Sequence, residues 1–331
     1  MIQLSKGKVD GMKILILGGT RFIGYTLLRE LLIQGHEVTI LNRGVTEASI
    51  PDSVERIQAD RDDDDSVSRA LENRSFDAAF DISAYTAEQL QGSLRALTGK
   101  VGHYIFTSTT AVYFGNLVYP IREHDRLMPD ERGGAYGWNK ILAERALALW
   151  SQNTGVPFSV IRPSYVYGAG TNSLGREPAF FYRLEHDRPL LLPTRGIPLA
   201  HLVHVEDIAQ MFISCLGNPH SYGQTYNGAG PDYASLRGWF NAMADAVGVA
   251  PKIVSVPDEL TPAMRSFPYQ TRRCVIYSTE KAQRELEYVP RWSTVSGLAQ
   301  SYEWYKRELS ASFSLDLTED DEILAKIKST D

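Results

Sequence analysis

The chain has 331 residues, of which 43% are apolar and 22% are charged, and its net charge is −6. This composition is typical of a globular protein with one large α/β unit or two lobes that share a core. The negative charge argues against a general attraction to nucleic acid or to a membrane surface, and no apolar run reaches the ~18 residues of a membrane span. We therefore expect a cytoplasmic protein whose partners include neither a membrane nor nucleic acid.

In the first half of the chain, short runs rich in β-branched residues alternate with amphipathic helical segments. Strands are predicted at 13–17, 37–41, 54–59, 77–82, 103–108 and 158–163. Helices are predicted at 22–34, 64–73, 86–97 and 134–153. Because strands that alternate with helices at this spacing form parallel sheets, the predicted fold class is α/β, with a doubly wound Rossmann sheet.

The pattern changes after residue 167, where a stretch rich in Gly and Pro surrounds one helical piece. This half of the chain is predicted to form a smaller C-terminal α/β lobe that binds the substrate over the carboxyl ends of the strands, where such sheets bind their ligands. The predicted organisation is an N-terminal tail (1–11), a dinucleotide-binding domain (12–167, with 201–230 returning to it), a substrate-binding lobe (168–200 and 231–310) and a C-terminal tail (311–331).

A glycine-rich loop follows the first predicted strand and leads directly into a helix. Its residues are Gly18, Gly19, Thr20, Arg21, Phe22, Ile23 and Gly24. Glycine allows a tight turn and a close approach to a pyrophosphate, and the free N–H groups at the helix start bind that anion. A glycine motif alone is weak evidence, but its place between a strand and a helix at the start of the fold predicts a dinucleotide cofactor.

The end of the second predicted strand bears on which cofactor is bound. An acidic residue there binds the adenosine ribose and selects NAD, whereas an arginine accepts a 2′-phosphate and selects NADP. Asn42 stands in place of the carboxylate, and Arg43 follows it. The cofactor is therefore NAD or NADP, with a preference for NADP, unless Arg43 is simply a solvated loop residue.

Tyr136 and Lys140 stand four residues apart in a predicted helix and so lie on one helical face. A free tyrosine has a pKa of about 10, too high for a base at neutral pH, and a nearby ammonium group lowers it. Tyr136 can then exchange a proton with an alcohol while hydride moves to or from a nicotinamide. This spacing is common by chance, but its place after the fifth predicted strand indicates a catalytic pair. The strand end at 107–110 offers hydroxyl groups to orient the substrate.

Several segments together resemble the extended short-chain dehydrogenase/reductase superfamily, in its NAD-dependent epimerase/dehydratase group. They are GGTRFIG, TSTTAVYFG, YGWNKILAE, RPSYVYGAG, LVHVEDIA and STEKAQRELEYVPRW, spread from about Lys13 to Arg307. The resemblance implies that Thr109 is the hydroxyl partner of Tyr136 and Lys140. It further implies a cofactor-binding set in which Asp60 contacts adenine beside Arg61, Ser83 and Ala84 line the cleft, and Ser164 and Tyr165 lie near the nicotinamide and the substrate.

Departures from the family pattern indicate a particular branch. Arg21 replaces the usual middle glycine, Asn42 the usual acidic residue, and Asp81 the usual histidine of the fourth strand. With GGTRFIG and QADRDD, these departures resemble the branch that includes the plant chloroplast stem-loop RNA-binding proteins and their bacterial relatives. That plant branch commonly lacks the tyrosine. Because Tyr136 and Lys140 are both present here, we expect an enzyme.

Two further departures narrow the expected chemistry. Thr110 and Ala111 stand where related 4,6-dehydratases carry an Asp-Glu pair, so dehydration is disfavoured. The arginine that binds a nucleotide diphosphate just before V-H-V is absent. Either another arginine substitutes for it or the substrate is not a nucleotide sugar; the candidates are Arg176, Arg183 and Arg195.

The function expected from these features is that of an NAD(P)-dependent epimerase or ketoreductase, acting on a secondary alcohol or ketone, with a sugar nucleotide as the expected substrate. The alternative is an RNA-binding or regulatory protein that retains the dehydrogenase fold. His201 and His204 lie on one predicted strand, without a third ligand at a metal-like spacing, so no metal is expected. Helices 86–97 and 134–153 form the dimer bundle in many relatives, which makes a homodimer the expected assembly.

Overall fold

The computed structural model describes residues 11–46, 48–113, 115–116, 118–264, 267–268 and 273–329. Its main sheet has seven strands: β1 (Lys13–Leu17), β2 (Glu37–Asn42), β3 (Glu55–Gln58), β4 (Ala78–Asp81), β5 (Tyr104–Thr107), β6 (Phe158–Pro163) and β11 (Gln224–Gly228). Their order is β11-β6-β5-β4-β1-β2-β3, and every pairing is parallel. The predicted doubly wound α/β class is confirmed.

Helices cover both faces of this sheet. The helices on one face are α1 (Phe22–Ile33) and α6 (Val205–Ile213), and those on the other are α2 (Asp64–Ala70), α3 (Ala87–Leu97) and α4 (Ala135–Thr154). Successive side chains of a strand point to opposite faces, so Ile14 and Ile16 pack with α1 and α6 whereas Leu15 and Leu17 pack with α2–α4. A strand buried on both sides explains the unbroken apolar run of β1.

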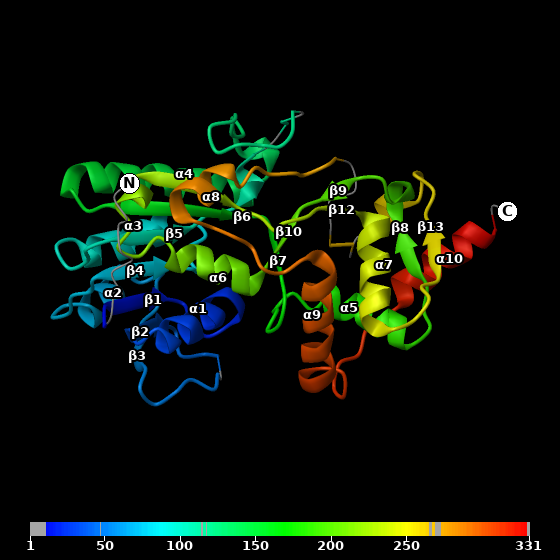
Figure 1. Ribbon diagram of the computed structural model, residues 1–331, viewed down its shortest axis with the longest axis horizontal. Coiled ribbons are helices and arrows are strands. Elements are labelled where there is room, and N and C mark those ends of the chain that lie inside the picture. The colour runs from blue at the N-terminus through cyan, green and yellow to red at the C-terminus, as the bar shows by residue number, and fades with distance from the viewer. Residues whose placement is uncertain are drawn as a thin grey trace, which may run out of the picture.

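The second lobe lies at one end of the sheet (Figure 1) and has a core of its own. Its elements are α5 (Glu177–Glu185), β8 (Leu190–Leu192), α7 (Leu236–Val247), β13 (Ile253–Ser255), α9 (Thr294–Glu308) and α10 (Thr318–Lys328), and α8 (Glu280–Leu286) returns to β11. Aromatic side chains fill much of this core, among them Phe181, Trp239, Phe240 and Tyr305. Besides the main sheet, the described residues form three two-stranded sheets: β7 (Tyr165–Tyr167) pairs with β10 (Leu202–His204), β9 (Leu199–Ala200) pairs with β12 (Ala234–Ser235), and β8 pairs with β13.

The segment 311–331, which was expected to be a C-terminal tail, contains the packed helix α10. Within 311–331, α10 packs its buried Ile323 against Leu191 of β8. Asp320 of α10 forms a two-point ion pair with Arg183 of α5, with N–O distances of 2.6 and 3.0 Å. The expected tail at 1–11 lies outside the described residues except for Gly11. In the part of the chain that is described, no helix is both long and apolar enough to cross a membrane.

Candidate active site

A cleft opens at the carboxyl ends of β1, β2, β3 and β4, and we call it the strand-end cleft. It is lined by Gly18, Thr20, Leu41, Asn42, Arg43, Gly44, Val45, Thr46, Ala59, Asp60, Arg61, Asp62, Ser83, Tyr85 and Gln89. The cavity volume of this cleft is about 270 Å³. Seven of the fifteen residues selected from sequence for cofactor binding therefore meet at one place: Gly18, Thr20, Asn42, Arg43, Asp60, Arg61 and Ser83. Tyr85, Gln89 and Asp62 also line the cleft, and sequence reasoning did not select them.

The glycine loop is shaped by close contacts that only glycine permits. A Cβ on Gly24 would lie 2.7 Å from the backbone nitrogen of Gly19, and one on Gly19 would lie 2.9 Å from Cγ2 of Ile40. Gly19 also has a φ of +91°, which side chains rarely adopt. α1 can therefore begin directly against the turn after β1. Its first turn has no side-chain cap at Arg21, so the backbone N–H groups there lack the usual side-chain acceptor.

The other residues of the glycine-rich loop lie in different surroundings. Arg21 and Phe22 line a neighbouring hollow with Thr20, Tyr25 and Val45. Ile23 packs against the core beneath α1. Of the loop residues, Gly18 and Thr20 are thus the ones that line the strand-end cleft itself.

Asp81, at the end of β4, is fully buried and organises the floor of the cleft. Its carboxylate accepts hydrogen bonds from the backbone N–H groups of Ser83 and Ala84 at 3.1 and 3.0 Å, and from the Tyr104 hydroxyl at 2.7 Å. It also pairs with Arg61 at 3.1 Å. Sequence analysis had noted Asp81 only as a departure from the family histidine. The structure shows that it holds the 83–84 loop and orients Arg61 toward the cleft.

Lys140 projects from α4 into a closed pocket and is only 2% exposed. Its Nζ donates to the backbone oxygens of Ala84 and Thr107, both at 2.6 Å. The rings of Tyr85 and Phe106 flank the same atom, with centroids 5.4 and 4.8 Å away. Burial lowers the pKa of Lys140 to about 8, although the negative charge of Asp81 opposes this shift. This lysine is therefore anchored to the loops that border the cleft.

Tyr136 and Thr109 lie side by side and share a hydrogen bond. α4 approaches the turn after β5 closely, because Gly137 has no side chain: a Cβ there would lie 2.5 Å from the backbone oxygen of Ala111. Burial raises the pKa of the Tyr136 phenol, whereas its hydrogen bond with Thr109 lowers it, and burial dominates. Tyr136 is nonetheless 48% exposed, so the phenol is within reach of a substrate. On its own it stays protonated at neutral pH.

A second buried network supports the same turn. Arg162 of β6 forms a two-point ion pair with Glu144 of α4 at 2.9 and 2.6 Å and donates to the Tyr113 hydroxyl at 2.6 Å. Glu144 also accepts a hydrogen bond from Ser108, the residue before Thr109. Sequence reasoning missed this network. The sequence carried one signal for this network: the charged Arg162 lies within the otherwise apolar strand FSVIRP, and a buried charge needs a partner.

The predicted Ser164 and Tyr165 follow β6 and lead toward the second lobe. Ser164 Oγ is buried and has no hydrogen-bond partner among the described residues. The Arg176 guanidinium lies 5.6 Å from the centre of the Tyr165 ring. Burial raises the pKa of Tyr165, while the charges of Arg176 and Arg273 lower it. Two cations thus act on Tyr165, and one of them, Arg176, was a sequence candidate for binding a diphosphate.

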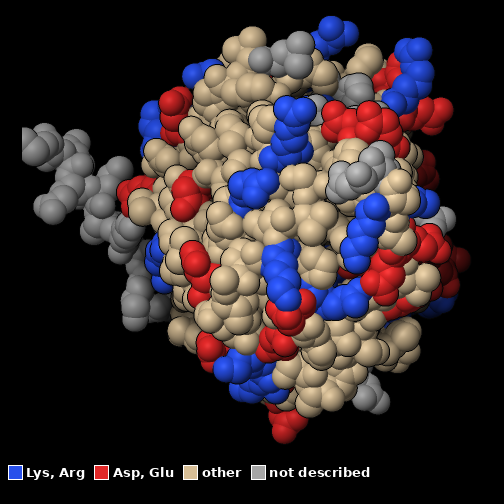
Figure 2. All heavy atoms as spheres, turned by 90° about the vertical axis from the view of Figure 1, so that its right-hand side faces the viewer, with Lys and Arg blue, Asp and Glu red and all other residues tan. Residues whose placement is uncertain are grey.

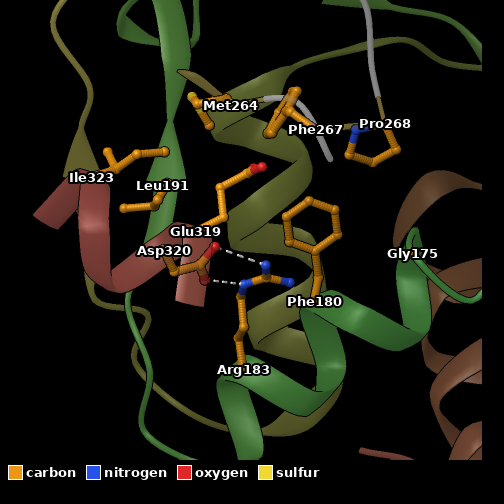
Figure 3. Close-up of a pocket in the computed structure, with 10 residues that line it drawn as sticks. All are labelled: Gly175, Phe180, Arg183, Leu191, Met264, Phe267, Pro268, Glu319, Asp320 and Ile323. Carbon is orange, nitrogen blue, oxygen red and sulfur yellow. Dashed lines mark hydrogen bonds and ion pairs between the residues drawn. The ribbon is translucent and has the colours of Figure 1, made fainter. Parts of the chain in front are cut away.

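The other two arginine candidates lie in different surroundings. Arg183 is held by Asp320 beside a small pocket of mixed polar and apolar lining between α5, β8 and α10 (Figure 3). The inner space of this pocket is about 30 Å³, enough for one or two water molecules but not for a substrate. Arg195 is exposed in the turn after β8. Arg176 is therefore the candidate with a place beside the predicted site.

The two candidate histidines make structural hydrogen bonds. His201 Nε2 lies 2.9 Å from the Gly230 oxygen, and its Nδ1 accepts from the Tyr277 N–H at 3.2 Å. His204 Nε2 lies 3.2 Å from Gln300 Oε1. Among the described residues, no group of three or more His, Cys, Asp or Glu side chains is arranged to hold a metal ion.

The parallel sheet and the glycine turn that leads into α1 place this protein in the class of α/β proteins with a dinucleotide-binding fold. A model of the NAD dependent epimerase/dehydratase family matches residues 14–229. The chloroplast stem-loop binding protein of 41 kDa b from Arabidopsis thaliana is 34% identical, over 95% of this chain and 84% of that relative. The chain belongs to the NAD dependent epimerase/dehydratase family, as its sequence resemblance predicted.

Two further comparisons involve enzymes. The 2′-dehydrokanamycin reductase of Streptomyces kanamyceticus is 24% identical, over 78% of this chain and 73% of that relative. The crystal structure of a UDP-glucose 4-epimerase from Thermotoga maritima with UDP-glucose superposes with a TM-score of 0.78 at 18% identity. That match covers 90% of this chain and 100% of the epimerase, so the two proteins share the whole fold.

Proposed function

We propose that the protein is an NAD(P)-dependent epimerase or ketoreductase that acts on a secondary alcohol or ketone. The observation that carries this proposal is the position of Tyr136 beside Thr109, with Lys140 anchored to the border of the strand-end cleft. The cleft fits a dinucleotide in two respects. Its glycine turn leaves no room for a Cβ at Gly19 or Gly24, and the buried Nη1 of Arg61 has no partner among the described residues.

In the proposed mechanism, the glycine turn and Arg61 would hold a nicotinamide cofactor in the cleft, and that cofactor would supply the hydride acceptor or donor. Tyr136 Oη takes the proton of the substrate hydroxyl when the adjacent carbon loses hydride, and it returns the proton when a ketone is reduced. The Thr109 hydroxyl orients the same substrate oxygen. The charge of Lys140 would offset the raised pKa of the buried phenol.

Within this chemistry we disfavour 4,6-dehydration. That reaction needs a carboxylate pair, and Thr110 and Ala111 provide none. The Thr110 side chain is moreover engaged in a hydrogen bond with Tyr277. Epimerisation or ketone reduction needs only the proton exchange at Tyr136 and the hydride.

For the substrate we propose a sugar nucleotide. The solved epimerase with a similar fold binds UDP-glucose, and the cations Arg176 and Arg273 beside Tyr165 suit a diphosphate. For the cofactor we propose a preference for NADP, because Arg43 lines the cleft where Asn42 removes the usual carboxylate. We also propose a homodimer through α3 and α4, which pack together on one face of the sheet.

The direct test replaces Tyr136 by Phe, which removes the proton but keeps the ring. We expect turnover to fall by about 10²–10⁴-fold, the usual contribution of a general acid or base. Cofactor binding should remain, because the ring and the cleft are unchanged. The measurement is cofactor absorbance during incubation with a set of nucleotide sugars and ketones, with Tyr222→Phe as control on the far side of the sheet. Equal turnover in wild type and Tyr136→Phe would reject the catalytic role.

A purified protein that retains tightly bound nicotinamide would favour the epimerase over the reductase.

A second candidate function rests on the name of the Arabidopsis relative, which is a stem-loop binding protein. Figure 2 views the second lobe from the side of α10 and shows Lys and Arg interspersed with Asp and Glu instead of a continuous basic patch. Binding to nucleic acid rests largely on positive charge and weakens with salt. Salt-dependent binding to a stem-loop RNA would support this alternative, and no binding at low salt would dismiss it.

A further inference from the structure

Tyr85 is unusual because its side chain is aromatic and 58% exposed, while its backbone is anchored by hydrogen bonds. Its backbone N–H donates to Gln89 Oε1 at 2.8 Å, and Gln89 Nε2 in turn donates to Asp62 at 2.8 Å. The two preceding residues are bound by the buried Asp81. An exposed ring on an anchored backbone contributes little to the hydrophobic core, so its position calls for another explanation.

The ring of Tyr85 touches both members of the proposed catalytic pair. Its centroid lies 5.4 Å from Lys140 Nζ and 6.2 Å from the centroid of the Tyr136 ring, with the two rings inclined at 48°. Tyr85 also lines the strand-end cleft. It therefore stands between the cleft and the pair.

The surroundings of Lys140 show what Tyr85 does there. Two backbone oxygens and the Phe106 ring enclose Nζ, and all three belong to buried residues: Ala84, Thr107 and Phe106. Tyr85 is the exposed member of this enclosure. The ionisable groups whose charges act on Lys140 are Asp81, Arg61 and Glu144. Removal of the Tyr85 ring would open Nζ to water while leaving its other contacts in place.

We propose that Tyr85 is a positioning residue for the catalytic pair: its ring caps Lys140 on the cleft side and holds the Tyr136 ring in place. The pair is called catalytic on the strength of the proposed function, but the cap itself is a property of the folded protein. The ring performs this role, and the hydroxyl is dispensable. Tyr85→Phe should therefore behave as the wild type, and Tyr85→Ala should not.

The first test measures the cap without any substrate. The full-length wild type and the variants Tyr85→Ala, Tyr85→Phe and Tyr222→Ala are methylated with formaldehyde and borohydride at pH 9, and the peptide that carries Lys140 is quantified by mass spectrometry. A deprotonated amine reacts once it is accessible, and burial lowers the pKa of Lys140 to about 8. We expect Lys140 to react at least about tenfold faster in Tyr85→Ala, equivalent to about 1.4 kcal/mol of protection, and at the wild-type rate in the other two.

Equal rates in Tyr85→Ala and wild type would overturn the proposal. Circular dichroism melting confirms that each variant is folded, and Tyr85→Leu replaces Tyr85→Ala if the latter is not.

The second test measures positioning during turnover. In Tyr85→Ala we expect kcat to fall about tenfold while the substrate KM stays within about twofold, because a misplaced phenol affects the proton transfer more than binding. Tyr85→Phe should restore kcat. A loss in Tyr85→Phe equal to that in Tyr85→Ala would contradict a role for the ring. If the wild type binds no nicotinamide cofactor, the proposed function fails, whereas the methylation result still decides whether Tyr85 caps Lys140.

Discussion

Lys140 illustrates how a single residue connects stability with the proposed chemistry. Its ammonium group is buried between two backbone oxygens and two rings, and burial lowers its pKa from 10.5 to about 8. The folded protein therefore binds fewer protons than the unfolded chain between pH 8 and pH 10.5. The free energy of unfolding rises with pH across this window, and the cost of the buried charge is fully present below pH 8. The site thus keeps a cation near Tyr136 at a cost in stability.

This cost can be measured with Lys140→Met. A shift of this size corresponds to about 3 kcal/mol. We expect the stability of the wild type relative to Lys140→Met to increase by about that amount between pH 7 and pH 10.5. Urea unfolding at both pH values measures the difference, with Lys328→Met, at an exposed position of α10, as the control. A wild-type advantage that does not change with pH would contradict the burial of a titrating ammonium group.

At the scale of elements, α10 shows how the second lobe is closed. This helix contributes the buried Ile323 to the cluster over β8, and its partly buried Leu324 and Ile327 pack against that cluster. Ion pairs to α5 and to the segment after it also hold the helix. Neighbouring carboxylates differ sharply in their surroundings. The Asp320 side chain is 8% exposed and bound to Arg183, whereas the Asp321 side chain is 60% exposed and bound to Arg188. Burial therefore makes the Asp320–Arg183 pair important for stability, whereas the exposed Asp321–Arg188 pair contributes little to it.

Two substitutions separate these contributions. Asp320→Ala leaves the buried Arg183 without its partner, and we expect it to lower the free energy of unfolding by about 3 kcal/mol. Asp321→Ala removes only an exposed pair and should cost less than about 1 kcal/mol. The midpoint of urea unfolding, combined with the slope, provides both values. Similar losses in the two variants would mean that α10 is not docked through Asp320.

For the whole molecule, the parallel sheet brings together residues from distant parts of the chain at one edge. The strand-end cleft takes residues from the turns after β1, β2, β3 and β4, and the proposed catalytic pair lies on α4. A ligand that binds this assembled cleft but not the unfolded chain must stabilise the fold as a whole. Binding at a concentration one hundred times the Kd adds about 2.7 kcal/mol.

Thermal melting therefore tests the proposed cofactor preference. At equal concentrations, NADP should raise the melting temperature more than NAD, because Arg43 can pair with the 2′-phosphate. Arg43→Ala should abolish the difference between the two cofactors, whereas Arg284→Ala, on α8 away from the cleft, should preserve it. A larger stabilisation by NAD in the wild type would reverse the preference that we propose.

The sequence by itself determined the features that depend on local pattern. Strand and helix periodicity predicted the parallel sheet, the glycine turn predicted the cleft, and a four-residue spacing placed Tyr136 and Lys140 on one face. Residues whose partners lie far along the chain were out of its reach. Lys140 bonds to Ala84, 56 positions away, and Arg61 pairs with Asp81, 20 positions away.

Only the tertiary structure decided how these distant residues meet. It showed that Asp81 organises the cleft and that Glu144 and Arg162 form a buried pair beneath the turn. It also placed Tyr85 against Tyr136 and Lys140. It also showed that α10 belongs to the second lobe. The physical reason is that hydrogen bonds, ion pairs and ring contacts depend on distance in space. A periodic pattern records which face of an element is buried, but it does not record which residue will be found opposite.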